Sequence, residues 1–417
     1  MSETVHIPQL RFPEFSGDWN RVKIQKLLDD KSIISHLDGN HGALYPRSEE
    51  FTKEGVPYVT ANDFINGKVD LKKCKCLPVE RASQFKKGIA HNGDVLFAHN
   101  ATVGPVALLE TDLEYVVLST TATYYRCDNN TLINKYLKVY LTSNDFVRQY
   151  SRVMSQSTRN QVPITTQRLF YINLPDKPEQ QKIAAFLTAV DSKIEQLSKK
   201  QELLGEYKKG AMQQIFSQAT RFKADDGNEF PDWEEVKLGN LTHKVGKKNK
   251  ENIKYPIYSI NNQEGFRPQS EQFDGLYSND GCYDISLYKI VNEKTFAYNP
   301  ARINVGSIGY GYNLNKVIVS SLYVCFKTND ELEDLYLLAY LDTDKFNKDI
   351  LRYEEGGVRQ YLFYENFSQI SIPLPGNDEQ AKISNFLSSI DNKIEQVDKQ
   401  LDESKQFKKA LLQQMFV

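Results

Sequence analysis

Several short runs of this sequence contain residue types that could catalyse a reaction, but each lacks part of the motif that the chemistry requires. The run 231–237 (PDWEEVK) has the carboxylates of a metal-dependent nuclease, yet Asp232 and Glu235 are three residues apart with no strand between them. The run 299–302 (NPAR) lacks the second proline and the aromatic residue of an amino-methyltransferase loop, and 306–311 (GSIGYG) is more typical of a hairpin or loop. Neither a Walker phosphate loop nor an H-E-x-x-H zinc motif occurs. The sequence therefore predicts a protein without catalysis of its own.

Composition and cysteine spacing argue against further classes. The five cysteines are odd in number and scattered, and Cys74 and Cys76 have no second pair at zinc spacing, so we expect reduced thiols and no metal site. No apolar run approaches the about 20 residues that a bilayer span needs, and we recognise no secretory signal. The net charge of -2 neither establishes nor excludes a nucleic-acid partner. These features favour a cytoplasmic protein.

The elements that would position any functional side chain occur in two copies. Residues 172–217 align with 372–417 at an offset of 200 without a gap, and 20 of these 46 positions are identical. An Arg-Phe motif with a following tryptophan also recurs, at 11–23 and at 221–239, and Trp19 and Trp233 are the only tryptophans. The chain therefore consists of two copies of one unit.

The closing segment of each copy has the apolar spacing of a long amphipathic helix. Apolar residues alternate at intervals of four and three over more than four heptads, which is typical of a coiled coil. Because a helix with one apolar stripe needs a partner, we expect the two segments to pair with each other; packing of each on its own body is the alternative. The expected pairing residues are Ile183, Leu187, Val190, Ile194 and Leu197 in the first copy, and Ile383, Leu387, Ile390, Ile394 and Val397 in the second.

The two bodies have short β-branched and aromatic runs separated by Gly, Asn and Asp, which predict strands, and each body ends in a helical stretch, near 134–154 and near 331–353. We expect an α+β protein with an internal pseudo-twofold repeat. Its predicted parts are a first body at 1–171, a spacer helix at 172–218, a second body at 219–371 and a C-terminal spacer helix at 372–417.

The order of these motifs resembles the specificity (S) subunit of type I restriction-modification systems. The shared features are the Arg-Phe motif, a strand-rich body, a polar loop with an arginine, and I-x-L-P-x-x-x-E-Q leading into a helix with D-x-K-I-E-Q, all present twice over essentially the full chain. The resemblance implies two target-recognition domains, each reading one half of a split, asymmetric DNA site. It also implies an antiparallel pairing of the two helices, which would hold the domains apart and set the unread gap.

The resemblance further implies partners. Two methyltransferase (modification) subunits would use S-adenosylmethionine to methylate adenine N6, and restriction subunits with ATP- and Mg-dependent translocase and nuclease activity would join them. The chain itself would bind double-stranded DNA and carry no cofactor. The alternatives are a coiled-coil adaptor with two protein-binding heads, and a single-chain DNA methyltransferase, which would need the motifs that the sequence lacks.

Polar residues in loops are the candidates for contact with bases or phosphates. The loop 155–161 (SQSTRNQ) suits a DNA-facing role, with a solvated loop as the alternative, and the matching run 355–361 keeps its arginine but has fewer polar neighbours. In the first body the candidates are Thr60, Asn62, His99, Asn100, Thr102, Gln156, Ser157, Thr158, Arg159, Asn160 and Gln161. In the second they are Lys247, Lys248, Ser259, Asn261, Asn262, Asn299, Arg302, Arg359 and Gln360.

Two further groups keep open alternatives. His36 and His41 are interpreted as loop residues, with base contact as the minority alternative, and Lys247 and Lys248 belong to a basic cluster that is either a phosphate contact or a solvated face. On the outward faces of the helices, the candidates for methyltransferase docking, or simply for a solvated surface, are Lys193, Glu195, Gln196, Gln213 and Gln214.

Overall fold

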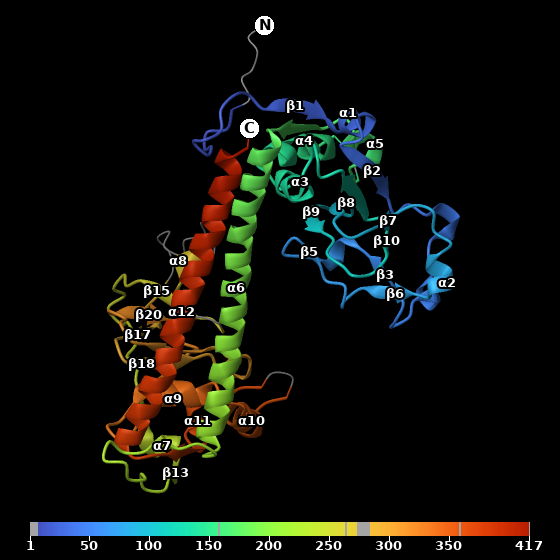
Figure 1. Cartoon of the computed structure of the whole chain (residues 1–417). Coiled ribbons are helices and arrows are strands. Elements are labelled where there is room, and N and C mark those ends of the chain that lie inside the picture. The colour runs from blue at the N-terminus through green and yellow to red at the C-terminus, as the bar shows by residue number, and fades with distance from the viewer. Residues whose placement is uncertain (1–6, 157–158, 263–264, 273–283, 358–359, 417) are drawn as a thin grey trace. The chain divides into compact units, whose positions relative to one another are not determined.

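The protein forms two compact units, seen here in a computed structural model that describes residues 7–156, 159–262, 265–272, 284–357 and 360–416. One unit joins Met1–Lys200 to Val397–Val417, and the other is Gln201–Gln396. Each unit contains a strand-rich head and part of both long helices, α6 (Lys177–Phe216) and α12 (Asn377–Gln414) (Figure 1). We call residues 7–171 the first head and residues 219–371 the second head.

The first head is built from twelve strands, five short α-helices and three 3-10 helices among its described residues. In chain order the strands and α-helices are β1 (Asn20–Lys23), α1 (Ile24–Asp29), β2 (Ile33–Asp38), β3 (Val56–Val59), β4 (Phe64–Ile65), β5 (Lys68–Val69), β6 (Lys75–Leu77), α2 (Val79–Ala82), β7 (Ile89–Ala90), β8 (Val95–Asn100), β9 (Thr102–Leu108), β10 (Val116–Leu118), β11 (Ala122–Cys127), α3 (Asn134–Tyr140), α4 (Asn144–Met154), α5 (Ile164–Gln167) and β12 (Tyr171–Leu174), the last of which leads directly into α6.

The second head repeats this order with fewer strands in its described residues. They are β13 (Glu234–Lys237), α7 (Leu238–Leu241), β14 (Thr242–Lys244), β15 (Ile257–Ile260), β16 (Phe266–Pro268), α8 (Gln269–Gln272), β17 (Lys289–Val291), β18 (Thr295–Tyr298), β19 (Ile308–Gly311), β20 (Val317–Val319), β21 (Val324–Thr328), α9 (Asp334–Leu341), α10 (Asp344–Tyr353), α11 (Tyr364–Phe367) and β22 (Ser371–Leu374).

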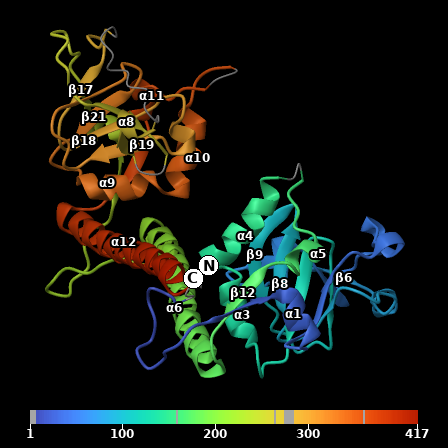
Figure 2. The ribbon, with the colours of Figure 1, turned by 90° about the horizontal axis from the view of Figure 1, so that it is seen from above.

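Three sheets organise the first head: β1-β12, β6-β3-β10-β7 and β2-β11-β8-β9-β5-β4. Strand β8 lies in the middle of the largest sheet and is buried on both faces, because successive side chains of a strand point to opposite sides. Val95 and Phe97 pack into the core that includes α3 and α4, whereas Leu96 packs into a second core with the smaller sheet. Figure 2 shows α3, α4 and α5 beside β8, β9 and β12.

The second head has the corresponding sheets β13-β22, β14-β21-β18-β19 and β16-β15-β20-β17. Its central strand β18 follows the same rule, since Phe296 and Tyr298 enter the helix-side core and Ala297 enters the other. Both heads share one parallel strand pair, β3 with β10 and β15 with β20, and the first head has a second, β5 with β9. The α+β architecture with an internal repeat is therefore the one that the sequence predicts.

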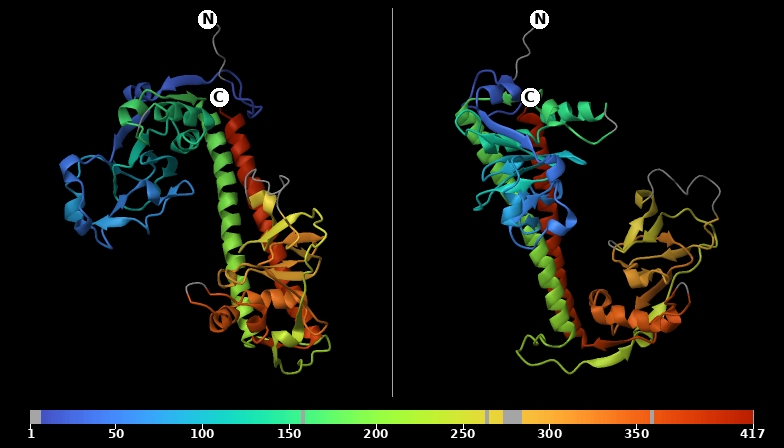
Figure 3. Two further views of the ribbon diagram at one scale, coloured as in Figure 1. Left: turned by 180° about the vertical axis from the view of Figure 1, so that it is seen from behind. Right: turned by 90° about the vertical axis from the view of Figure 1, so that its right-hand side faces the viewer.

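The long helices pair in antiparallel fashion inside each unit, as both views of Figure 3 show. In the first unit the beginning of α6, with Ile183 and Leu187, shares a core with the end of α12, where Leu411 and Met415 lie. In the second unit the end of α6, including Met212 and Ile215, shares a core with Ile383, Leu387 and Ile390 at the beginning of α12. All ten expected pairing residues are buried or half-buried.

Two lysines that interrupt the apolar spacing of the long helices, Lys208 and Lys408, form ion pairs between the helices. Lys408 on α12 forms an ion pair with Asp191 on α6 at 2.6 Å, and Lys208 on α6 forms the same pair with Asp391 on α12 at 2.6 Å. These are one interaction repeated by the internal symmetry, one copy in each unit. The repeated D-x-K-I-E-Q run therefore supplies an aspartate that fixes the register of the antiparallel pair.

The helical stretch at the end of each head is divided into two helices, α3 and α4 in the first head and α9 and α10 in the second. The Ser143 hydroxyl accepts a hydrogen bond from the Phe146 amide, and Thr343 accepts one from Phe346. Such a side chain caps the N-terminus of a new helix, which is why the chain turns there. No helix among the described residues is long and apolar enough to cross a membrane.

Candidate nucleic-acid interface

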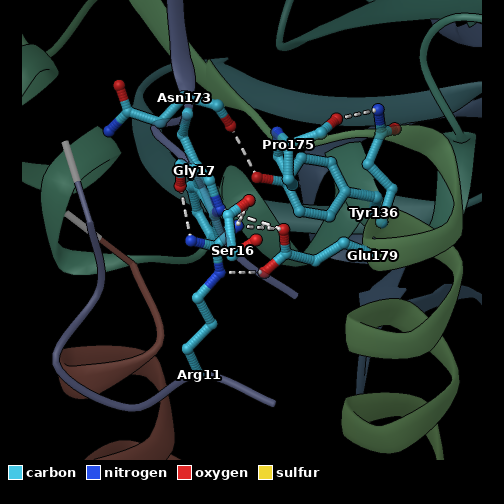
Figure 4. Close-up of polar contacts among 9 residues, drawn as sticks. Arg11, Ser16, Gly17, Tyr136, Asn173, Pro175 and Glu179 are labelled. Carbon is cyan, nitrogen blue, oxygen red and sulfur yellow. Dashed lines mark hydrogen bonds and ion pairs between the residues drawn. The ribbon is translucent and has the colours of Figure 1, made fainter. Parts of the chain in front are cut away.

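The first head is attached to α6 by a clamp of three residues, Arg11, Trp19 and Glu179. Figure 4 shows Arg11 and Glu179 of this clamp. The Glu179 carboxylate, which is 1% exposed, accepts bonds from Arg11 Nε and Nη2, both at 2.8 Å, and from Trp19 Nε1 at 3.2 Å. The pKa of Arg11 is raised because its cation is hydrogen-bonded to this carboxylate. The Arg-Phe motif and the L-P-x-x-x-E-Q motif therefore form a single structural element.

The second head has the same clamp, made by Arg221, Trp233 and Glu379. Glu379 accepts bonds from Arg221 Nη2 at 2.7 Å and from Trp233 Nε1 at 2.8 Å, and its side chain is fully buried. Asp232 and Glu235, which carry the letters of a nuclease motif, lie beside this clamp and on the exposed strand β13. These positions show that the run PDWEEVK is part of the structural framework of the second head.

The glutamine of the E-Q pair holds the helix that covers each head. Gln180 Oε1 accepts the Ile133 amide at 3.0 Å, just before α3, and Gln380 Oε1 accepts the Glu333 amide at 2.8 Å, just before α9. A tyrosine on each helix completes the joint, since Tyr136 donates to the Asn173 carbonyl and Tyr336 to the Pro373 carbonyl. The repeated motifs therefore form the same hydrogen-bonded attachment in each head. The loops at the other edge of each head do not take part in it and can differ.

Candidate residues of the first head that are 60 positions apart meet at the turn between β8 and β9. Asn100 and Gln161 form an isolated β-bridge, and the Ala101 amide donates to the Asn160 carbonyl at 2.9 Å. Thr102 begins β9 on the same turn and is exposed, as is Asn160. We call His99–Thr102 and Asn160–Gln161 the reading corner.

The backbone of the reading corner has an unusual conformation. Ala101 has a φ of 63°, in the left-handed region that favours glycine, and the β8–β9 pairing shifts register between Phe97 and His99. Such strain and irregular pairing persist only where the surrounding structure enforces them, and they concentrate at functional sites. On this turn the Thr102 side chain is exposed, whereas His99 is buried.

Thr60 caps a neighbouring short 3-10 helix, Ala61–Asp63, which contains Asn62 and joins the corner through the turn 119–121. The Thr121 hydroxyl accepts the Ala61 amide at 2.9 Å, and the Thr121 carbonyl accepts the His99 amide at 3.0 Å. The Thr60 hydroxyl is itself occupied by Asp63, whereas Asn62 is exposed. The structure thus brings most first-head candidates to one edge. Gln156 is exposed after α4, Arg159 is exposed before Asn160, and Ser157 and Thr158 lie outside the described residues.

The second head gathers its candidates in a similar way. The Ser307 hydroxyl donates to the Ile260 carbonyl at 2.9 Å, which joins the 299–307 loop to the end of β15, where Ser259, Asn261 and Asn262 lie. The Leu362 amide donates to the Pro300 carbonyl at 3.0 Å, so the loop that contains Gln360 lies beside Asn299. Arg302 and Gln360 are exposed, and Arg359 lies outside the described residues.

Lys247 and Lys248 are attached to a different edge of the second head. The Lys247 carbonyl accepts the Ile290 amide at 2.8 Å and Lys248 bridges to Lys289, so both lie beside β17, with β20 between that strand and β15. Both side chains are exposed. The structure therefore does not bring these two lysines to the edge at which Asn262 and Asn299 lie.

Two candidate histidines of the first head, His36 and His99, are buried. His36 is not a loop residue, as the sequence suggested, but lies in β2 and is 2% exposed, where burial lowers its pKa to about 3. His99 is equally buried and burial lowers its pKa as well. His41 follows a turn after β2 and its Nε2 lies 2.7 Å from the Leu118 carbonyl. Because His36 and His99 are buried, their side chains do not contact bases directly.

Sequence reasoning missed two features of this edge. Lys86 and Lys87 are exposed and line a cleft of about 390 Å³ with His41 and Asn40, beside the strand end that leads to the turn 119–121. Two adjacent lysines were the available signal. The second feature is Gln167, a fully buried glutamine in α5, whose role no local pattern indicates. No cluster of three or more metal-binding side chains occurs among the described residues.

Known proteins share this architecture over the full chain. The family described as type I restriction modification DNA specificity domain matches residues 34–204 and 231–404. Two relatives from Methanocaldococcus jannaschii are similar: the putative type I restriction enzyme MjaX specificity subunit, 26% identical over 96% of this chain and 93% of the relative, and the MjaVIII specificity subunit, 24% identical over 97% and 92%.

Solved structures agree on the fold. The S subunit of a type I restriction-modification system from M. genitalium superposes with a TM-score of 0.60 at 16% identity, covering 99% of both chains. A chain from a study of assembly and conformational transition of the type I system gives 0.56 at 17% identity, covering 96% of this chain and 97% of that one. Because the family matches both halves of the chain, the protein belongs to the type I restriction-modification specificity (S) subunits, the DNA specificity subunits with target-recognition domains and no catalytic role of their own.

Proposed function

We propose that each head binds one half of a split, asymmetric DNA sequence and that the chain thereby positions methyltransferase and restriction subunits on that sequence. The observation that carries this proposal is a contrast between the clamps that attach the two heads to the long helices and the polar loops at the edges of the heads. The clamps at Glu179 and Glu379 are the same. The loops at the reading corner differ in length and residue type from the loops that contain Asn262 and Asn299. Two different half-sites require that combination.

Asparagine, glutamine, threonine and arginine at these edges suit base recognition in the major groove, because their donors and acceptors match base edges. Exposed lysines elsewhere on the two heads suit phosphates, which position a protein without reading sequence. Lys86 and Lys87 would contact the backbone beside the first half-site, and Lys247 and Lys248 would do so at the second head. A net charge of -2 is compatible with this arrangement because the contacts are local.

Two copies of the methyltransferase subunit would bind the helices. Exposed positions that packing does not constrain are nevertheless identical in the two copies, which is expected if each contacts the same partner: Lys193 and Lys393, Gln196 and Gln396, Lys209 and Lys409, Gln213 and Gln413, Gln214 and Gln414. Glu195 differs from these, because in the first unit it forms an ion pair with Lys68 at 3.0 Å.

The chemistry would belong to the partners. S-adenosylmethionine would supply the methyl group for adenine N6 on the methyltransferase subunits, and ATP and Mg would serve the restriction subunits, in the cytoplasm where the DNA is. An adenine inside a duplex must leave the stack to be methylated, so this chain has only to fix the register of the complex on the DNA.

The test is to co-express the chain with its cognate methyltransferase subunit and to map N6-methyladenine across the host genome by single-molecule sequencing. We expect one split motif with a fixed gap that disappears when the chain is omitted. An active methyltransferase with no chain-dependent motif would refute the proposal and would favour the adaptor alternative.

A further inference from the structure

A buried hydrogen-bond network in the first head has Gln167 at its centre. The Gln167 side chain is fully buried, and its Oε1 accepts a bond from the Tyr125 hydroxyl at 2.6 Å. Thr123 Oγ1 and His36 Nε2 also lie 3.2 Å from that oxygen. The His36 ring stacks on Tyr125 with centroids 4.1 Å apart, which holds both donors in place.

The other end of the Gln167 amide holds the loop that forms the reading corner. Gln167 Nε2 donates to the Val162 carbonyl at 2.8 Å, and a carbonyl only accepts, so the orientation of the amide is fixed. His99 Nδ1 lies 3.2 Å from the same carbonyl, and the Val162 amide donates to the His99 carbonyl at 2.8 Å. Val162 directly follows Asn160 and Gln161. The network therefore connects the core to the loop that carries the candidate base contacts.

The second head shows that the fold does not need this network. Phe367 occupies the last position of α11, as Gln167 does in α5, and its ring packs against Phe326 and Tyr298 with centroids 4.9 and 5.4 Å apart. Leu362 still donates its amide to the Pro300 carbonyl there, so a backbone hydrogen bond anchors the loop in the second head as well. Aromatic packing thus supports the same scaffold.

The polar version also costs stability. His36 Nδ1 and His99 Nε2 are buried without a hydrogen-bond partner in the described residues, and each unpaired buried polar atom is unfavourable. The Tyr298 hydroxyl in the second head is likewise buried without a partner among the described residues, so the unpaired atoms by themselves do not distinguish the two heads. Phe367 stands at the position of Gln167 in the second head, and this difference between the heads fits a role of the network in the first head's own specificity.

We infer that Gln167, held by Tyr125 and Thr123, is a positioning residue that sets the place of Asn160 and Gln161 against the first half-site and so determines which bases they accept. The inference rests on the proposed function and deepens it for one head. Gln167 does not touch DNA; it acts through Val162.

The experiment measures methylation by the full chain in complex with its cognate methyltransferase, on DNA in which each base of the split motif is varied singly. Gln167→Met keeps the length of the side chain. It removes both the oxygen that accepts from Tyr125 and the nitrogen that donates to the Val162 carbonyl. We expect it to lower discrimination at one or more first-half positions by at least about fivefold, the lower end of what one base contact contributes, and to leave the second half unchanged. Tyr125→Phe removes one donor with little change of shape and should act in the same direction by at least about twofold.

The matched control is Tyr136→Phe, which removes a buried hydroxyl bonded to the Asn173 carbonyl in the same head, away from the corner. It should leave discrimination in both halves intact. Full discrimination in a folded Gln167→Met, or an equal loss in both halves, would overturn the inference; if that variant does not fold, Tyr125→Phe decides by the same criterion. A wild-type complex with no split motif would instead refute the proposed function, and it would be seen before any variant is made.

Discussion

Replacing Glu179 with alanine should destabilise the first unit severely, because this carboxylate joins three parts of the chain. It accepts two charge-assisted bonds from Arg11, whose side chain is 13% exposed, and one bond from Trp19, which is 3% exposed. Breaking a buried pair from one side typically costs about 3–5 kcal/mol, since the remaining cation and the indole N–H lose their partner. We therefore expect a loss of about 4 kcal/mol in the free energy of unfolding.

Tryptophan fluorescence can report this loss locally. In a Trp233→Phe background Trp19 is the only tryptophan, so urea unfolding followed by its emission reports on the first unit. A double-mutant cycle with Arg11→Ala should give a coupling energy of about 2–3 kcal/mol. Glu14→Ala is the control: Glu14 pairs with Lys182 at the surface, and exposed pairs contribute about 1 kcal/mol or less.

Two results would refute the reasoning. A Glu179→Ala variant within about 1 kcal/mol of its parent would show that the clamp does not stabilise the head. A coupling energy near zero between Arg11 and Glu179 would show that the loss comes from elsewhere in the side chain's surroundings.

Three further predictions follow. Lowering the pH from 7 to 5 should destabilise the first unit by about 2 kcal/mol, because the His36 pKa is lowered from 6.5 to about 3 by burial, so the unfolded chain gains a proton that the folded chain excludes; a flat urea-unfolding profile would contradict this. Asn160→Ala should reduce base discrimination by about fivefold or more in the first half-site only, and Asn262→Ala in the second only, in the single-base methylation assay; a loss in the opposite half would be contrary. Deleting residues 197–203 and 396–402 together should shorten the unread gap by about 3 base pairs, as about 10 Å of each helix is removed; an unchanged gap in the methylation map would disprove the role of the helices.

The parts of the fold that depend on local periodicity could be predicted from sequence. Heptad spacing identified the helices and their partners, and the 200-residue repeat identified two heads. The roles of the polar residues in these motifs could not be predicted, because they depend on contacts distant in sequence. Glu179 binds Arg11 across 168 residues, and Lys408 binds Asp191 across the helix pair. The sequence alone does not distinguish a buried glutamate or aspartate from an exposed one.

The candidate site was predicted only as a collection of polar loops. Its geometry comes from pairing that no local pattern encodes, such as the bridge between Asn100 and Gln161. His36 looked like a loop residue because glycine and asparagine follow it, yet strand pairing of β2 with β11 buries it. Gln167 gave no signal because a polar residue in a short segment is usually exposed. Tertiary context determined each of these positions.

The most direct test of the account exchanges one head. Residues 20–171 would be replaced by the corresponding segment of a similar specificity subunit, with both helices and the second head kept, and N6-methyladenine would be mapped in cells that express the cognate methyltransferase. If each head binds its own half-site, one half of the split motif should change while the other half remains the same. A motif that changes in both halves, or in neither, would contradict the claim that each head binds its own half-site.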